Sequence, residues 1–231
     1  MAPMPSRHRV RSTLLTVALL LLAGCGDDDG ASSSSATATT ATTTTAAEAA
    51  GPQLGDASPS IAELPGALKT GPPWPANNGS TLQLRLRALG LPPLTEEGQV
   101  VHIHQHLDLY VDGSRVTVPA NIGIDADGGF ISDLHTHDTS GIMHVESPTQ
   151  RDFTLGQFFA VWGLPLSATC VGSRCEQGTR QLRVWVDGTA VGGDPTRVVL
   201  AEHQAIAIAY GTAAQMPDPV PASFDFAAAG L

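Results

Sequence analysis

The stretch from Val100 to Glu146 constrains the fold most, because it holds six of the eight histidines in the chain. Three of them alternate in Val-His-Ile-His-Gln-His, and successive side chains of an extended strand point to opposite faces. We therefore expect a strand over residues 100–111 with one polar face and one apolar face, the latter interrupted only by Gln105. The residues expected on the polar face are His102, His104, His106, Asp108 and Tyr110.

The second histidine block, Leu134 to Glu146, contains a turn sequence. Asp138 and Gly141 suit the first and fourth positions of a type I turn, and β-prone residues flank them. A hairpin folded at this turn would place His135 opposite His144 and gather five side chains on one face. These five are His135, His137, His144, Asp133 and Glu146, with Asp133 opposite Glu146.

Imidazole nitrogens and carboxylate oxygens on a semi-rigid sheet form a site for a divalent metal ion, zinc or copper(II) first, with iron, nickel or manganese as further candidates. Copper(I) is disfavoured, because Met143 is the one methionine near the block and no free thiol is expected. The alternative interpretation is a solvated polar strand face with hydrogen-bonded histidines. The candidate metal site comprises His102, His104, His106, His135, His137, His144, Glu146 and Asp138; the main expected ligands are His104, His135, His137 and His144, and Asp138 is expected to orient an imidazole.

The first 25 residues have the pattern of a secretory signal peptide: three arginines, an apolar run over residues 14–22, and Leu-Ala-Gly-Cys at its end. That ending resembles a bacterial lipobox, which implies that Cys25 is lipidated and anchors the protein to a membrane. The apolar run is too short to span a bilayer comfortably, so a retained transmembrane helix is the weaker alternative. We expect a cell-envelope protein facing the periplasm or exterior. The outer membrane is favoured in a Gram-negative source, because Gly26 is not the aspartate of an inner-membrane retention signal.

Residues 26–79 are rich in Ala, Thr, Ser, Gly and Pro, a composition that buries too little apolar surface to offset the ordering of the backbone. We predict a disordered tether there, one globular domain over residues 80–217, and a mobile tail over residues 218–231. The fold class expected for the domain is α+β: a strand-dominated antiparallel or mixed sheet with one packed helix.

Hydrophobic periodicity predicts the elements of the domain. Alternation predicts strands over residues 81–89 and 181–186, and two more strands within residues 197–210. Asp112-Gly113 and Asp187-Gly188 predict hairpin turns. The one helix is expected from Thr154, as its cap, to Gly163, because four apolar residues recur at helical spacing. These four are Leu155, Phe158, Phe159 and Trp162.

Three blocks resemble a group of secreted prokaryotic proteins: residues 118–124, the block from Leu134 to Pro148 with its Leu-His-Thr-His-Asp start, and the block from Phe153 to Phe159. The resemblance covers roughly residues 100–210 and implies no particular activity. Separately, the order of hairpin, helix, strand and final hairpin over residues 142–210 is similar to the β-grasp arrangement. That similarity concerns the fold alone.

Charge and cysteine content narrow the partners and the compartment. The net charge is −10, and removing the leader, which carries three arginines and no acidic residue, changes it to −13. Such an acidic surface repels phosphate backbones, so we expect no nucleic-acid partner, and the acyl chain on Cys25 as the membrane contact. Cys170 and Cys175 are expected to form a local disulfide, because an exported protein meets an oxidising compartment; metal ligation by this pair is the alternative.

Other chemistry is poorly supported. The Asp-Thr-Ser-Gly run at Asp138 resembles the aspartic-protease triplet, but a serine interrupts it and no second copy supplies the partner carboxylate. No Gly-x-Ser-x-Gly elbow or phosphate-binding loop is present. The predicted function is metal capture, buffering or delivery at the cell envelope. The alternatives are a metal-dependent hydrolase or oxidoreductase with Glu146 or Asp138 as the base, and a structural or adhesive surface lipoprotein with dispersed, pH-responsive histidines.

Overall fold

The computed structural model describes residues 51–56 and 63–231. The predicted signal peptide with Cys25, and most of the predicted tether, lie outside these residues. In the described part of the chain, no helix combines the length and the apolar character that crossing a membrane requires.

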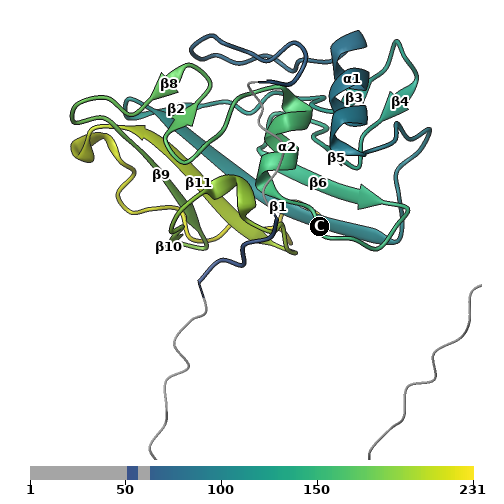
Figure 1. Ribbon diagram of the computed structural model, residues 1–231. Coiled ribbons are helices and arrows are strands. Elements are labelled where there is room, and N and C mark those ends of the chain that lie inside the picture. The colour runs from purple at the N-terminus through teal and green to yellow at the C-terminus, as the bar shows by residue number, and fades with distance from the viewer. Residues whose placement is uncertain (1–50, 57–62) are drawn as a thin grey trace, which may run out of the picture. The chain divides into compact units, whose positions relative to one another are not determined.

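A mixed sheet of seven strands forms the centre of the fold, which confirms the predicted α+β class (Figure 1). Its strands are β1 (Val101–Val111), β2 (Ser114–Val116), β5 (Leu134–His135), β6 (Ile142–Ser147), β9 (Gln181–Val186), β10 (Thr189–Ala190) and β11 (Gln204–Gly211). They follow the order β10-β9-β11-β1-β6-β5, and β2 also pairs with β1. The central strand β1 is parallel to β11 and antiparallel to β6, so segments distant in sequence lie on both sides of the first histidine block.

Both predicted Asp-Gly turns are present and have left-handed backbone at both residues. The φ angles are 53° at Asp112 and 82° at Gly113, and 50° at Asp187 and 75° at Gly188. A type I′ turn requires this geometry, and its twist matches that of the flanking strands. The two turns join β1 to β2 and β9 to β10.

Two further pairs of short strands lie outside the main sheet. They are β3 (Ile124–Asp125) with β4 (Phe130–Ile131), and β7 (Cys170–Val171) with β8 (Arg174–Cys175). In the second pair Cys170 lies directly opposite Cys175, and the two form the predicted disulfide.

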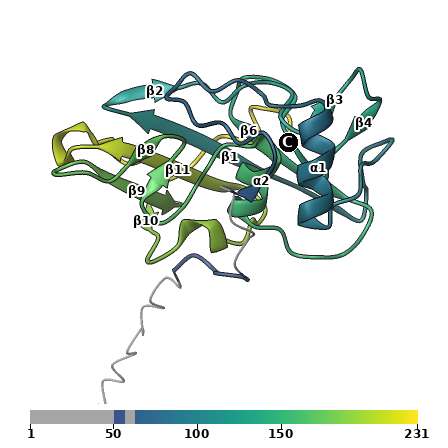
Figure 2. The ribbon, with the colours of Figure 1, turned by 45° about the horizontal axis from the view of Figure 1, so that its top comes forward.

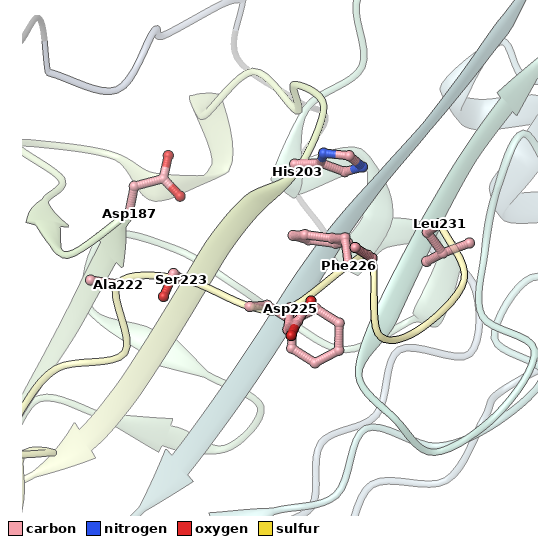
Figure 3. A pocket seen from close by; sticks show the side chains of 9 residues that line it. Asp187, His203, Ala222, Ser223, Asp225, Phe226 and Leu231 are labelled. Atoms are coloured by element: carbon pink, nitrogen blue, oxygen red, sulfur yellow. The ribbon is translucent and has the colours of Figure 1, made fainter.

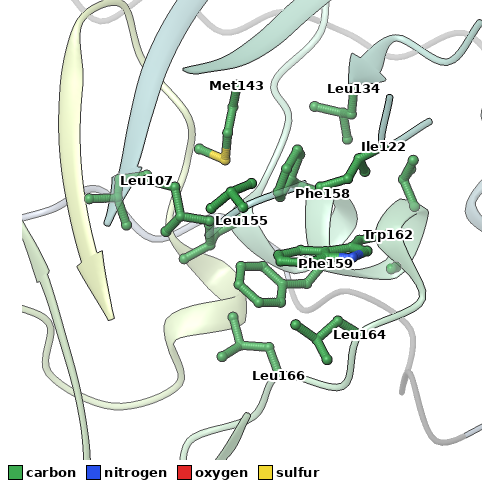
Figure 4. Close-up of a cluster of buried hydrophobic side chains, with 14 of the residues drawn as sticks. Leu107, Ile122, Leu134, Met143, Leu155, Phe158, Phe159, Trp162, Leu164 and Leu166 are labelled. Carbon is green, nitrogen blue, oxygen red and sulfur yellow. The ribbon is translucent and has the colours of Figure 1, made fainter. Parts of the chain in front are cut away.

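The predicted helix is α2 (Leu155–Trp162), which is closed at both ends by its own sequence. Thr154 and Gln157 form a reciprocal capping box at its start, and Gly163 ends it in the left-handed conformation. The three aromatic side chains of α2 are fully buried: Phe158, Phe159 and Trp162. Figure 4 shows these rings packed with Leu107 of β1 and Met143 of β6, so α2 covers the face of the sheet opposite the histidines.

The prediction of a strand over residues 81–89 is wrong, because these residues form the helix α1 (Ser80–Leu89). Its leucines fit both periods, but burial follows the helical one: Leu82 and Leu86 are fully buried and Leu84 is 45% exposed. Arg85 on the same buried side donates to the carbonyl of Val161 at the end of α2, and burial lowers its pKa to about 10. Both views place α1 beside α2 (Figure 1; Figure 2).

Other expectations need correction. Residues 197–210 contain one strand, β11, in place of the two predicted. Short 3₁₀ turns span Pro195–Arg197, before this strand, and Ala213–Gln215, after it. The predicted domain limits, residues 80 and 217, are too narrow, since Trp74 is 2% exposed and Phe226 is 5% exposed. Apolar anchors hold both flanks to the domain. A β-grasp arrangement of the second half is not confirmed.

The packing of the buried α2 side chains against the sheet should contribute strongly to the free energy of unfolding. We expect Phe159→Ala to lower the free energy of unfolding by about 3–5 kcal/mol, because it leaves a cavity at a fully buried ring. Leu84→Ala on the exposed side of α1 should change it by less than about 0.5 kcal/mol. Urea unfolding followed by circular dichroism measures both; equal losses would contradict the assigned core.

Candidate metal centre

Strand register places the imidazoles on one face of the sheet. His104 of β1 lies opposite His144 of β6, and His144 lies opposite His135 of β5, so these three form a row across three strands. In the next row His102 lies opposite Glu146, whose backbone N–H donates to the carbonyl of Asp133. The predicted register of the second block is therefore confirmed. The strand pairing ends at His135, and residues 136–141 form a loop rather than a tight turn.

Four side chains form the first group that could hold a metal ion: His135, His137, His144 and Glu146. One ligand atom of each lies within 4.8 Å of the others. The Nε2 atoms of His135 and His137 are 3.2 Å apart. Two nitrogens bound to one tetrahedral zinc ion lie about 3.3 Å apart, since each bond is about 2.0–2.1 Å long. The spacing of these two rings therefore suits a shared ion.

Hydrogen bonds at the other ring nitrogens set the tautomers of two of these rings. Nδ1 of His135 lies 3.0 Å from the carbonyl oxygen of Ser132, which can only accept, so Nδ1 carries the proton and Nε2 keeps its lone pair. Nδ1 of His144 lies 3.1 Å from Oε1 of Glu146 and donates to it in the same way. Such partners orient the histidine ligands of metal sites.

Glu146 is a buried carboxylate surrounded by imidazoles. Its Oε1 lies 3.1 Å from Nδ1 of His144 and 3.4 Å from Nε2 of His102. Burial raises its pKa, but the hydrogen bond with His144 and the neighbouring imidazoles outweigh burial, so the pKa is lowered overall. Among the described residues, its Oε2 atom is buried without a hydrogen-bond partner. An ionised, half-partnered carboxylate is suited to binding a cation.

Two more buried polar atoms beside Glu146 lack partners among the described residues: Nε2 of His104 and Oδ2 of Asp133. Leaving a buried polar atom unpaired costs about 1–3 kcal/mol, so native proteins have few such atoms. Three of the five such atoms among the described residues belong to Glu146, His104 and Asp133, which indicates a site that a ligand completes.

Burial keeps the central imidazoles neutral. It lowers the pKa of His135 to about 3, and the neighbouring His144 and His137 act in the same direction. The pKa of His104 is lowered by burial and then by His144 and His102. Neutral imidazole is the form that binds a metal ion. These two rings can therefore bind a cation at neutral pH without first losing a proton.

A second group that could hold a metal ion consists of His102, His104 and Glu146. Two predicted site residues, His106 and Asp138, lie outside both groups. Burial lowers the pKa of His106; its Nε2 is 3.1 Å from the carbonyl of Ser140, and its ring stacks on Phe224 with centroids 4.0 Å apart. Asp138 is exposed and accepts a hydrogen bond from the backbone of Ser140, whose hydroxyl and amide lower its pKa. In the described structure no hydrogen bond links Asp138 to an imidazole, so its expected orienting role has no support.

The structure adds two acidic residues that the sequence analysis missed. Oε1 of Glu97 lies 3.4 Å from Nε2 of His137. Oε1 of Glu202 lies 3.9 Å from Nδ1 of His104 and 2.9 Å from Nε2 of His203. Glu97 precedes the histidine strand by only a few residues, which is a weak local signal. Glu202 reaches the site through the pairing of β11 with β1, which no local pattern shows.

The turn at His203 packs against the histidine strand, because its backbone N–H donates to the carbonyl of His104 at 2.7 Å. The ring is half-exposed and stacks on Phe226, with centroids 4.5 Å apart. Figure 3 shows His203 over Phe226 of the C-terminal segment, and both residues line a hollow of about 370 Å³ at this end of the sheet. His203 belongs to neither ligand group in the described residues.

No protein-family model, curated protein or solved structure matches the chain. The resemblance to secreted prokaryotic proteins therefore stays a prediction, and the site is interpreted from its own geometry.

The lowered pKa of His135 predicts how stability depends on pH in metal-free protein. The unfolded chain takes up a proton below about pH 6.5, whereas the folded chain does so only near pH 3. The contribution of neutral His135 to the free energy of unfolding is therefore fully present above pH 6.5 and is lost as the pH falls towards 3. Between these values the free energy of unfolding of the wild type should fall more steeply than that of His135→Asn, by at most about 1.4 kcal/mol per pH unit.

Urea unfolding at several pH values in the presence of a chelator measures the difference. Asn can still donate to Ser132 but does not titrate in this range. His203→Asn, which replaces a half-exposed ring, is the matched control and should follow the wild type. Parallel curves for the wild type and His135→Asn would contradict the assignment of a buried neutral imidazole.

Proposed function

We propose that this protein binds a divalent metal ion, zinc or copper(II), through its clustered histidines, and that it captures, buffers or delivers the ion at the cell envelope. One observation carries the proposal: His135, His137, His144 and Glu146 bring four ligand atoms within 4.8 Å of one another. Three imidazoles and one carboxylate suit zinc and copper(II), both of which favour nitrogen ligands over all-oxygen sites.

The arrangement also weighs against the structural or adhesive alternative, which expected dispersed histidines. Five of the imidazole rings form a continuous series, with neighbouring centroids 4.5–5.1 Å apart. Burial and the neighbouring imidazoles lower the pKa of His104 and of His135, so these two rings stay uncharged at neutral pH and do not suit a pH-responsive surface. The envelope location rests on the lipobox-like sequence at Cys25.

Metal content should depend on the first group. Full-length protein purified without added metal, or loaded with zinc and dialysed, is expected to carry bound metal on elemental analysis. The double variant His135→Ala with His137→Ala should lose at least one ion per chain, because it removes the two closest nitrogens.

His137→Ala alone guards against a folding defect, since its side chain is 45% exposed, and should weaken zinc binding by at least about tenfold. His203→Asn should keep the metal content of the wild type. Circular dichroism shows whether each variant is folded. Equal metal content in the wild type and the folded variants would refute the proposal.

A metal-dependent enzyme is the second candidate, favoured by a hollow beside the group. A cavity of about 390 Å³ is lined in part by Glu96, Glu97 and Asp125, and Glu97 contacts His137. Water bound to an ion there would have an acidic side chain nearby as a base. Zinc-loaded wild type should then hydrolyse a chromogenic ester or phosphoester that His137→Ala does not. Equal rates for both proteins would contradict this second candidate.

A further inference from the structure

A second group of ligand atoms lies beside the first. His102, His104 and Glu146 each offer a ligand atom, and these atoms lie within 4.8 Å of one another. Glu146 is also a member of the first group, so one carboxylate belongs to both. Apart from this carboxylate, the two groups have no ligand in common.

Unpartnered atoms point to a ligand in this second group. His104 is 8% exposed, and its Nε2 has no hydrogen-bond partner among the described residues. The same holds for Oε2 of Glu146, whose side chain is 3% exposed. An imidazole nitrogen and a carboxylate oxygen can each bind a cation, and neither atom has a hydrogen-bond partner in the described part of the protein. Burial without a partner is the arrangement that a bound ion would resolve.

The strand register places the two groups in contact. His104 of the second group lies opposite His144 of the first, and their ring centroids are 4.8 Å apart. His102 lies opposite Glu146, with 3.4 Å between Nε2 and Oε1. The carboxylate therefore stands between imidazoles of both groups. In two-metal sites the ions lie about 3.5–4 Å apart, a separation that one carboxylate spans with one oxygen on each ion.

The two groups differ in the number of ligands. Each includes one exposed ring, since the side chain of His137 is 45% exposed and that of His102 is 44% exposed, but the first group offers four ligand atoms and the second offers three. Three protein ligands leave one position of a four-coordinate ion for water or another small oxygen ligand. The second position is thus the one with room for an exchangeable ligand, and it lies next to Glu202, whose carboxylate is 3.9 Å from Nδ1 of His104.

From this juxtaposition we propose that the protein holds two divalent ions as a pair bridged by Glu146: an inner ion on His135, His137 and His144, and an outer ion on His102 and His104. This inference rests on the proposed metal binding and adds its stoichiometry and its shared ligand. The outer ion is the exchangeable one of the pair, since three protein ligands hold it and four hold the inner ion.

Zinc stoichiometry tests the pair. Equilibrium dialysis of the full-length protein followed by elemental analysis should give two ions per chain for the wild type and for His203→Asn. His102→Ala and His137→Ala each replace an exposed ring, so both should fold, and each should retain one ion. A wild type with one ion would overturn the pair and leave the single site standing. A wild type with none would overturn both proposals.

Copper(II) tests the bridge. In wild type loaded with copper(II), magnetic coupling through Glu146 should give a half-field electron paramagnetic resonance signal and a spin count below the copper content. His102→Ala, with one copper, should show no half-field signal and a spin count equal to its copper content. Two uncoupled coppers in the wild type would overturn the shared carboxylate.

Discussion

The antiparallel pairing of β1 with β6 is the interaction on which the site depends. It sets His104 opposite His144 and His102 opposite Glu146. A slip of one residue would turn every side chain of one strand to the other face, so the histidines would meet the core and Met143 would meet water. Packing of Met143 against α2 opposes that slip. The apolar face thus fixes the register, and the register fixes which imidazoles meet.

Burial then gives this assembly its chemistry. Withdrawing imidazoles from water disfavours their charged form, which is why the pKa of His135 falls to about 3. The same environment would normally neutralise a carboxylate, but hydrogen bonding from His144 keeps the pKa of Glu146 low. The result is neutral nitrogen donors around an anionic oxygen in a poorly hydrated pocket. Without a cation, this pocket carries the free-energy cost of a buried, incompletely paired carboxylate. A bound cation would offset that cost.

Local patterns predicted the parts of this site that depend on local geometry. Alternation identified the polar face of β1, and residues flanking Asp138 identified the pairing of His135 with His144. Sequence patterns failed where the helical and the strand period both fit the same residues, and where the contacting residues are far apart in the sequence. The leucines of α1 satisfied strand and helix periods alike, and buried Arg85 disguised the helical stripe. Glu202 arrives through parallel pairing of β11 with β1, which sequence periodicity does not encode.

Strand geometry also explains why the histidines on one face of the sheet do not all belong to one metal site. Alternate residues of a strand lie about 6.5–7 Å apart, so His102 and His106 are separated by about 13 Å and cannot share an ion whose bonds are about 2 Å long. Periodicity therefore predicts a common face but not a common site. The ring of His106 lies outside the ligand groups, because its Nε2 contacts the carbonyl oxygen of Ser140 and its face stacks on Phe224. His102 is linked to the other imidazoles through Glu146 on β6, whose carboxylate contacts both His102 and His144.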